Sequence, residues 1–256
     1  MNEPTLEYTE STTDQKPVVV LVHGAFAESA SWNSVIGILN RNGIECIAVA
    51  NPLRSLAGDA AYVRDVIAAV GRPVVLVGHS YGGLVISEGA AGNHNVSALV
   101  YVNAFVPEHG QTAFDLSTEF PGSTLADALS PRTLSDGSVE LVIRPSVFRD
   151  QFCADVPEET AALMAATQRP VTQAALTEPL SAETPAWKSI PSWCVFSDQD
   201  RNIPVAEHRA GAARAKARVV REVPGGSHAL SVSRPEAVAE VIIDAVSAGR
   251  ASSVAA

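Results

Sequence analysis

Residues 73–82, with the sequence Pro-Val-Val-Leu-Val-Gly-His-Ser-Tyr-Gly, decide the fold of this chain. The five apolar residues predict a buried strand, and Gly78, Ser80 and Gly82 then form the G-x-S-x-G pattern of a sharp turn from a strand into a helix. Such a turn strains the serine backbone and leaves no room for a Cβ two residues to either side. The pattern therefore predicts a Ser80 hydroxyl at the N-terminus of a helix, where backbone N–H groups face a developing negative charge.

A serine hydroxyl is a weak nucleophile at neutral pH, so the turn predicts a histidine base and an orienting carboxylate in the chain order serine, acid, histidine. His228 is the candidate base, because it lies in a Gly-rich loop after a strand-like run. Asp198 and Asp200 are the candidate acids in the loop after an earlier apolar run. Asp200 is favoured because Pro204 opens a helix just beyond it, whereas Asp198 suits a turn residue that bonds the loop backbone.

The other five histidines carry no comparable pattern. His23 and His79 adjoin glycines and are expected to support their loops. His94, His109 and His208 lie in polar surroundings, and a surface position is expected for each.

Stabilising a tetrahedral oxyanion requires two N–H donors, one after the nucleophile and one in the loop after an early strand. Tyr81 follows Ser80 directly. The second donor is expected from His23-Gly24-Ala25, which follows the apolar run at residues 18–22. Gly24 lets the backbone come close, so Ala25 is the candidate donor.

With these four motifs the chain resembles proteins of the α/β-hydrolase fold. It is especially similar to the compact branch that holds plant methylesterases, hydroxynitrile lyases and small bacterial carboxylesterases. The likeness covers residues 17–248 and is loose between residues 103 and 191. By this resemblance the roles of nucleophile, base, orienting acid and the two oxyanion donors fall on Ser80, His228, Asp200, Ala25 and Tyr81.

Two departures argue against other activities of the same fold. Hydroxynitrile lyases of this branch carry a threonine and a lysine where this chain has Gly24 and Ala229. Dehalogenases and epoxide hydrolases of the fold use an aspartate nucleophile where this chain has Ser80. The resemblance therefore implies a hydrolase with a serine nucleophile.

Short apolar runs alternate with amphipathic helices, which predicts a six-stranded, mainly parallel sheet with helices on both faces. The expected strands are residues 18–22, 44–49, 73–77, 96–102, 193–196 and 219–223. A long segment interrupts this alternation and is expected to be an inserted lid, with a hairpin that turns at Asp136-Gly137. The expected organisation is a flexible leader (1–16), a core (17–103 and 191–248), a lid (104–190) and a flexible tail (249–256).

Five of the seven phenylalanines fall in the lid segment, where most are expected to hold the lid to the core. Phe26 and Phe105 each follow a strand directly and are the candidate substrate contacts. Such a pocket suits an apolar acyl or alcohol group.

Charge and cysteine content limit the partners. Lys and Arg number 18 against 28 Asp and Glu, a formal net charge of −10, which argues against binding nucleic acid or an anionic membrane. Cys46, Cys153 and Cys194 show no metal-ligand spacing and cannot all pair, so reduced thiols are expected. Residues 1–16 lack the features of a signal peptide. These features predict a cytoplasmic protein without cofactor or metal, and a homodimer is left open.

The expected function is a serine hydrolase that cleaves a carboxylic ester or lactone of a small, largely apolar substrate through an acyl-enzyme on Ser80. Two alternatives are left open. A cofactor-free perhydrolase or haloperoxidase would use peroxide in place of water, and a receptor or carrier of the same fold would bind a small molecule without turnover.

Overall fold

The computed structural model describes residues 16–254, so residues 1–15 of the expected leader and residues 255–256 lie outside the described residues. Six parallel strands form the main sheet in the order β2-β1-β3-β4-β8-β9, which confirms the predicted sheet. The strands are β1 (Val18–Val22), β2 (Cys46–Val49), β3 (Val74–His79), β4 (Val96–Val102), β8 (Ser192–Ser197) and β9 (Val219–Val223).

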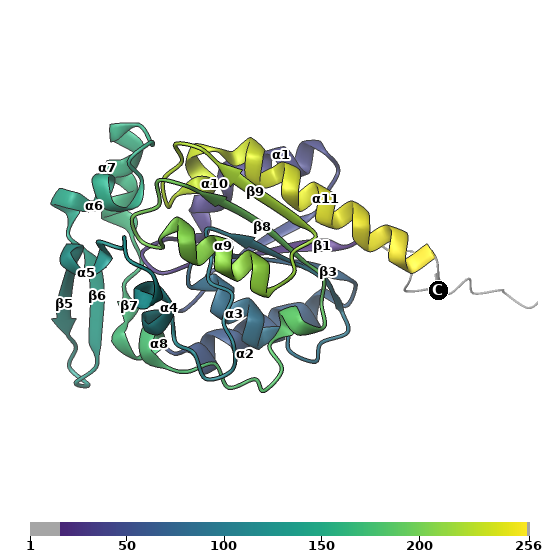
Figure 1. Ribbon diagram of the computed structural model, residues 1–256, viewed down its shortest axis with the longest axis horizontal. Helices are drawn as coiled ribbons and strands as arrows, with labels where there is room; N and C mark the ends of the chain where they lie inside the picture. Colours follow the sequence, from purple (N-terminus) through teal and green to yellow (C-terminus); the bar gives the residue numbers. More distant parts are fainter. Residues whose placement is uncertain (1–15, 255–256) are drawn as a thin grey trace, which may run out of the picture.

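Helices cover both faces of this sheet, as Figure 1 shows. Side chains alternate along each strand, so Val19 and Leu21 pack with α1 and α11 on one face, while Val20 and Val22 pack with α2 and α3 on the other. The helices around the sheet are η1 (Ser29–Trp32), α1 (Asn33–Arg41), α2 (Leu56–Val70), α3 (Gly82–Gly89), α9 (Val205–Arg214), α10 (Leu230–Ser233) and α11 (Pro235–Val254).

Local signals in the sequence set the ends of α2. The Ser55 side chain accepts a hydrogen bond from Gly58 N and caps the first turn. Gly71 follows the last turn with a φ of 66°, a left-handed conformation that glycine adopts without strain. None of the helices within residues 16–254 combines the length and the apolar run that a bilayer crossing requires.

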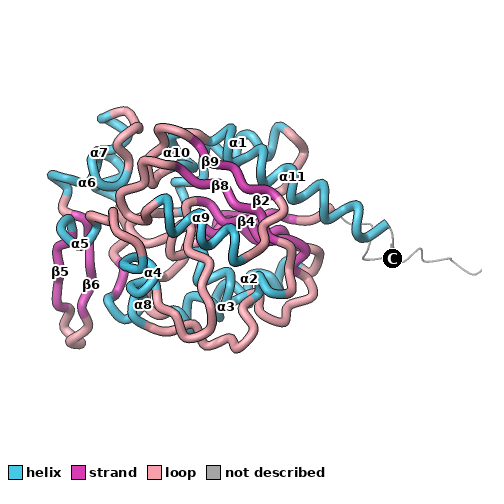
Figure 2. The backbone as a smooth tube through the Cα atoms, in the orientation of Figure 1, coloured by secondary structure: helices cyan, strands magenta, loops and turns pink. Residues whose placement is uncertain are grey.

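A long insertion separates β4 from β8 and lies to one side of the sheet in Figures 1 and 2. The predicted hairpin is present, with Gly137 at a φ of 84° in its turn. A third short strand, which the sequence did not indicate, pairs with the hairpin. The elements of the insertion are α4 (Ala113–Glu119), α5 (Leu125–Ala128), β5 (Leu129–Thr133), β6 (Val139–Ile143), α6 (Pro145–Phe152), α7 (Glu158–Thr167), β7 (Val171–Thr172), α8 (Gln173–Thr177) and η2 (Ala186–Lys188).

Polar contacts hold the insertion to the helices below the sheet. The Glu88 carboxylate in α3 accepts hydrogen bonds from the Ser181 backbone N–H at 2.9 Å and from Ala182 N–H at 3.0 Å. Arg54, just before α2, forms an ion pair with Glu140 of β6. The hairpin is therefore connected to the core through its buried glutamate.

Six residues of the expected flexible tail, 249–254, belong to helix α11, and residues 255–256 lie outside the described residues. Helix α11 continues through Gly249 and ends only at Val254. The physical reason is that this stretch is rich in alanine and serine and contains no proline, so one glycine is not enough to stop a helix that is already formed.

Helix α3 approaches the segment that follows strand β4 too closely for any side chain at its second residue. A Cβ placed on Gly83 would lie 2.1 Å from the Phe105 carbonyl oxygen and 3.1 Å from Ala104 Cβ. Gly37, inside α1, is different, because a Cβ there would meet only the Arg41 side chain at 3.5 Å.

We expect Gly83→Ala to lower the free energy of unfolding by about 1–3 kcal/mol, because the backbone must shift to remove the overlap. The matched change Gly37→Ala is expected to raise it by about 0.5–1 kcal/mol, because alanine favours the helix. Urea unfolding followed by circular dichroism measures both. Equal effects of the two substitutions would contradict the close approach of α3.

Candidate active site

The strand order creates a crevice at one edge of the sheet. From β1 the chain moves outward to β2 and then returns to the other side of β1 as β3. Loops at the carboxyl ends of two such strands diverge and leave room for a ligand between them. Ala25 and Phe26 follow β1, and Ser80 and Tyr81 follow β3, so the crevice lies between the predicted nucleophile and one predicted oxyanion donor.

Ser80 occupies the strained turn that the sequence predicts. Its φ is 55°, in the left-handed region. Its N–H donates to the Asn103 carbonyl oxygen at 3.1 Å, and its own carbonyl accepts from Gly83 N at 2.9 Å. A Cβ on Gly78 would lie 2.6 Å from the Gly82 carbonyl oxygen, and one on Gly82 would lie 2.7 Å from the Val22 carbonyl oxygen. Both glycines are therefore required by close backbone contacts.

Asp200 and His228 lie together, although 28 residues separate them. His228 Nδ1 lies 2.7 Å from Asp200 Oδ2, and both side chains are fully buried. Asp200 Oδ1 accepts hydrogen bonds from the backbone N–H groups of Asn202 (2.8 Å) and Ile203 (3.0 Å). Burial by itself raises the pKa of this carboxyl, but His228 and the hydrogen bonds from His208 and His228 outweigh it and hold the pKa well below its usual range.

The contacts of His228 define which nitrogen is free. The Asp200 carboxylate accepts a hydrogen bond from Nδ1–H, so Nε2 of the neutral ring is the unprotonated nitrogen. Nε2 is buried and has no hydrogen-bond partner within residues 16–254. Phe152 packs edge-on against the ring with centroids 4.9 Å apart. The arrangement leaves Nε2 able to accept a proton.

His79, the residue before Ser80, supports the histidine loop. Its Nε2 lies 3.0 Å from the His228 carbonyl oxygen, which can only accept, so His79 is protonated at Nε2. Burial, followed by the neighbouring His228, lowers the pKa of His79 to about 3. His79 is therefore a neutral donor that fixes the backbone of the candidate base.

Asp198, the alternative acid, has a different contact. Its Oδ1 accepts a hydrogen bond from Gly225 N at 2.7 Å. This bond joins the loop after β8 to the loop that carries His228. The side chain of Asp198 thus contacts backbone, and Asp200 contacts the imidazole.

The two expected oxyanion donors both border a common cavity. Neither Ala25 N nor Tyr81 N donates a hydrogen bond to another group among the described residues. The Tyr81 side chain is held by its hydroxyl, which donates to Asp59 Oδ2 at 3.0 Å. Both amides are accordingly available to an oxygen in the cavity.

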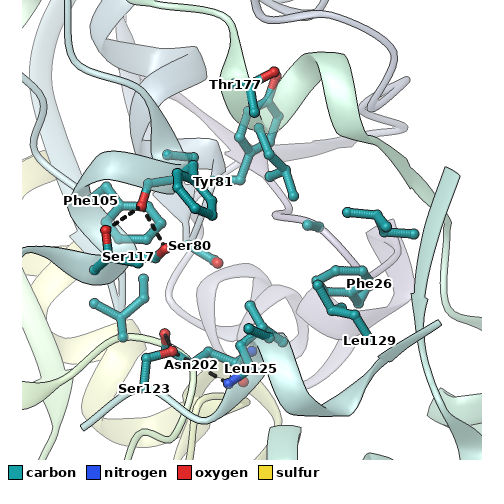
Figure 3. Close-up of a pocket in the computed structure, with 18 of the residues that line it drawn as sticks. Phe26, Ser80, Tyr81, Phe105, Ser117, Ser123, Leu125, Leu129, Thr177 and Asn202 are labelled. Carbon is teal, nitrogen blue, oxygen red and sulfur yellow. Dashed lines mark hydrogen bonds between the residues drawn. The ribbon is translucent and has the colours of Figure 1, made fainter. Parts of the chain in front are cut away.

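The cavity measures about 620 Å³ and lies between the core and the insertion. Figure 3 shows Ser80, Tyr81 and Phe105 on one wall, with Phe26 and Leu129 across the space. Phe26 and Phe105, the expected substrate contacts, line it. Phe114 and Phe120 of the insertion line it too, although the sequence did not single them out as substrate contacts. No lining residue is charged.

Two residues near the site were not recognised in the sequence. The expectation of a surface position was wrong for His208, because α9 turns it inward, where its Nε2 lies 3.0 Å from Asp200 Oδ2 and its ring stacks on Phe196. Asn103, at the end of β4, donates through Nδ2 to the carbonyl oxygens of Ser227 (2.9 Å) and His228 (3.1 Å). The position of His208 four residues after the helix-opening Pro204 is its only signal in the sequence. Asn103 has no such signal.

Among the described residues, no group of three or more His, Cys, Asp or Glu side chains is arranged to hold a metal ion. His79, His208 and His228 lie near Asp200, but the Asp200 carboxylate is already engaged with two imidazoles and two backbone N–H groups.

Residues 19–241 match the family model described as the alpha/beta hydrolase family. The chain belongs to this family. Among solved structures it resembles polyneuridine aldehyde esterase, with a TM-score of 0.77 and 20% identity over 90% of this chain and 99% of that chain, which shows the fold. The predicted α/β-hydrolase fold is thereby confirmed.

Curated relatives include esterases. The chain is 32% identical over 136 residues to the carbendazim hydrolyzing esterase of Nocardioides sp., which covers 43% of this chain and 54% of that protein. It is 22% identical over 244 residues to a chloroplastic Arabidopsis thaliana protein named as a methylesterase, which covers 88% of this chain and 63% of that protein. The chain thus spans less than two thirds of the length of both relatives.

The contacts of the two candidate acids lead to different expectations. Asp200→Asn keeps the shape but loses the charge beside His228, so we expect kcat to fall by as much as ~10⁴-fold. Asp198→Asn disturbs only a loop contact and should cost ~10-fold or less. Parallel steady-state kinetics on an ester, with circular dichroism to verify folding, decides between them. A larger loss at Asp198 would transfer the role of the acid to that residue.

Proposed function

We propose that this protein is a cofactor-independent serine hydrolase that cleaves a carboxylic ester or lactone of a small, largely apolar substrate. The observation that carries the proposal is the 2.7 Å contact between Asp200 and His228, which leaves His228 Nε2 unpaired. Asn103 is hydrogen-bonded to both Ser80 and His228. The Ser80 backbone N–H donates to the Asn103 carbonyl oxygen, and Asn103 Nδ2 donates to the His228 carbonyl oxygen. Nucleophile, base and acid therefore belong to one hydrogen-bonded cluster of loops.

In the proposed reaction His228 Nε2 takes the Ser80 proton while Ser80 Oγ attacks the carbonyl carbon. The N–H groups of Ala25 and Tyr81 stabilise the oxyanion, and Asp200 stabilises the imidazolium. The imidazolium then protonates the leaving alcohol as the carbon–oxygen bond breaks and an acyl group remains on Ser80. Water, deprotonated by His228, then attacks the acyl carbon. The bond from that carbon to Ser80 Oγ breaks, the imidazolium returns its proton to Oγ, and the carboxylic acid leaves.

Gly24 and Ala229 support hydrolysis over cyanohydrin cleavage. A Cβ on Gly24 would lie 2.6 Å from Ser80 Cβ and 3.2 Å from Ser80 Oγ, so a threonine here would displace the nucleophile. Ala229 is buried, and its N–H donates to the Phe152 carbonyl oxygen at 3.0 Å.

The insertion is assigned as the lid of this pocket. It supplies Phe114, Phe120 and Leu125 to the cavity wall opposite the sheet edge. Phe114 remains 58% exposed, which places it at the mouth of the cavity. An apolar mouth and an uncharged wall suit a neutral substrate.

Ser80→Ala is expected to leave the fold intact and to reduce kcat by ~10⁴- to 10⁶-fold, because the covalent route is lost. Ser97→Ala is the matched control. Ser97 lies near the amino end of strand β4, and its hydroxyl donates to the Val74 carbonyl oxygen. Initial rates on a panel of p-nitrophenyl esters measure the effect. Undiminished ester turnover in the Ser80 variant would refute the proposed mechanism.

The value of kcat/KM is expected to rise with pH, because only the neutral form of His228 accepts the serine proton. Asp200 and His79 do not contribute near neutrality, since the pKa of each lies well below it. Burial raises the pKa of Glu207 to about 7, so Glu207→Gln is the matched control and should keep the same dependence of kcat/KM on pH.

EDTA should have no effect on activity. Reversible loss of activity in EDTA that a divalent metal restores would contradict the cofactor-free mechanism.

A further inference from the structure

The cavity wall is almost devoid of free hydrogen-bond donors away from the oxyanion amides. The hydroxyls of Ser117, Thr118 and Thr177 line the cavity, but each donates to a carbonyl of its own helix. The Ser123 hydroxyl donates to the Asn202 carbonyl oxygen at 2.9 Å. The exceptions are the side-chain amides of Gln173, which is exposed to solvent, and of Asn202, which is buried.

The orientation of the Asn202 amide follows from its neighbours. Gln151 Nε2 donates to the Arg201 carbonyl oxygen at 2.9 Å, and a carbonyl can only accept, so the nitrogen end of Gln151 is fixed. The same Nε2 lies 2.8 Å from the side chain of Asn202 and must meet its oxygen, Oδ1. Thr124 Oγ1 donates to the other end of Gln151, its Oε1, at 2.8 Å. The Asn202 nitrogen, Nδ2, is therefore the atom that does not face Gln151.

Asn202 Nδ2 donates no hydrogen bond to any of the described residues, 16–254, although Asn202 is only 2% exposed and borders the cavity. Its backbone is rigid as well, because its N–H donates to Asp200 Oδ1 at 2.8 Å. A donor that meets no protein acceptor bonds to water or to an oxygen of a bound ligand. The cavity is the place from which an acceptor can come.

We propose that Asn202 forms a second polar recognition point in the pocket, and that the preferred substrate is a neutral ester carrying a further acceptor oxygen, a keto or ether group, besides the scissile carbonyl. This inference rests on the proposed ester hydrolysis at Ser80. Figure 3 shows Asn202 with Ser123 and Leu125 at the end of the cavity opposite Thr177. One end of the substrate chain then accepts a hydrogen bond from Asn202, and the remainder makes apolar contacts with the cavity wall.

The consequence is a selectivity that alkyl esters do not reveal. A neutral hydrogen bond contributes about 0.5–1.5 kcal/mol net, so the oxygen should raise kcat/KM by about 3- to 10-fold over the matched alkyl ester. A charged acceptor gains nothing similar, because no cationic side chain lines the cavity to balance it.

The test compares p-nitrophenyl heptanoate with its 5-oxo and 6-oxo analogues and, for the alcohol side, pentyl acetate with 4-oxopentyl acetate. Each kcat/KM is divided by the rate of alkaline hydrolysis of the same ester. The wild-type protein should prefer at least one oxo ester over its alkyl counterpart. Asn202→Leu, which keeps the size and removes the donor, should return that ratio to about one.

Thr177→Val is the matched control, because it removes a cavity hydroxyl that already bonds its own helix, and the selectivity ratio should stay as in the wild type. A wild-type ratio near one in both series, or an unchanged ratio in Asn202→Leu, would overturn the inference. If the wild type hydrolyses none of these esters, the proposed function fails separately. Calorimetric titration of Ser80→Ala and of the double variant Ser80→Ala/Asn202→Leu with the same esters then tests Asn202 by binding alone. Tighter binding of an oxo ester that is lost in the double variant supports the inference, and equal binding of oxo and alkyl esters, or an unchanged preference in the double variant, overturns it.

Discussion

The left-handed backbone of Ser80 is the constraint on which the rest of the site depends. A non-glycine residue at a φ of 55° persists only where its surroundings hold it there. Here the holding contacts are backbone ones, at distances that exclude a Cβ at Gly78, Gly82 and Gly24. Because the Val22 carbonyl touches Gly82, strand β1 and helix α3 stay in contact, and the loop with Ala25 lies beside Tyr81. The same three glycines thus position the proposed nucleophile and both proposed oxyanion donors.

The base and the acid reach this turn through polar contacts between loops. Asp200 accepts four hydrogen bonds, from the backbone of Asn202 and Ile203 and from the rings of His208 and His228. Its carboxylate is therefore both ionised and fixed in direction. The insertion also contributes, because the Phe152 carbonyl accepts from Ala229 N and its ring packs on His228. The segment that closes the pocket also supports the histidine loop.

The sequence predicted those parts of the protein that local rules determine. The turn at Ser80, the hairpin turn at Gly137 and the helix end at Gly71 each follow from residues within a few positions of one another. The burial of His208 and the bonds of Asn103 depend on how α9 and the loop after β8 pack, and no short-range pattern carries that information. Likewise the amide of Asn202 is oriented by a hydrogen bond from Gln151, 51 positions away in the sequence.

The central claim, that Ser80 is the covalent nucleophile, is tested most directly by its reaction with a fluorophosphonate. Mass spectrometry of the intact protein, followed by peptide mapping, measures how many groups are added and where. The account predicts one phosphonyl group per chain on Ser80, with ester hydrolysis lost in proportion, and much slower labelling in His228→Ala. A label on another residue, or full hydrolysis by protein labelled completely at Ser80, would contradict it.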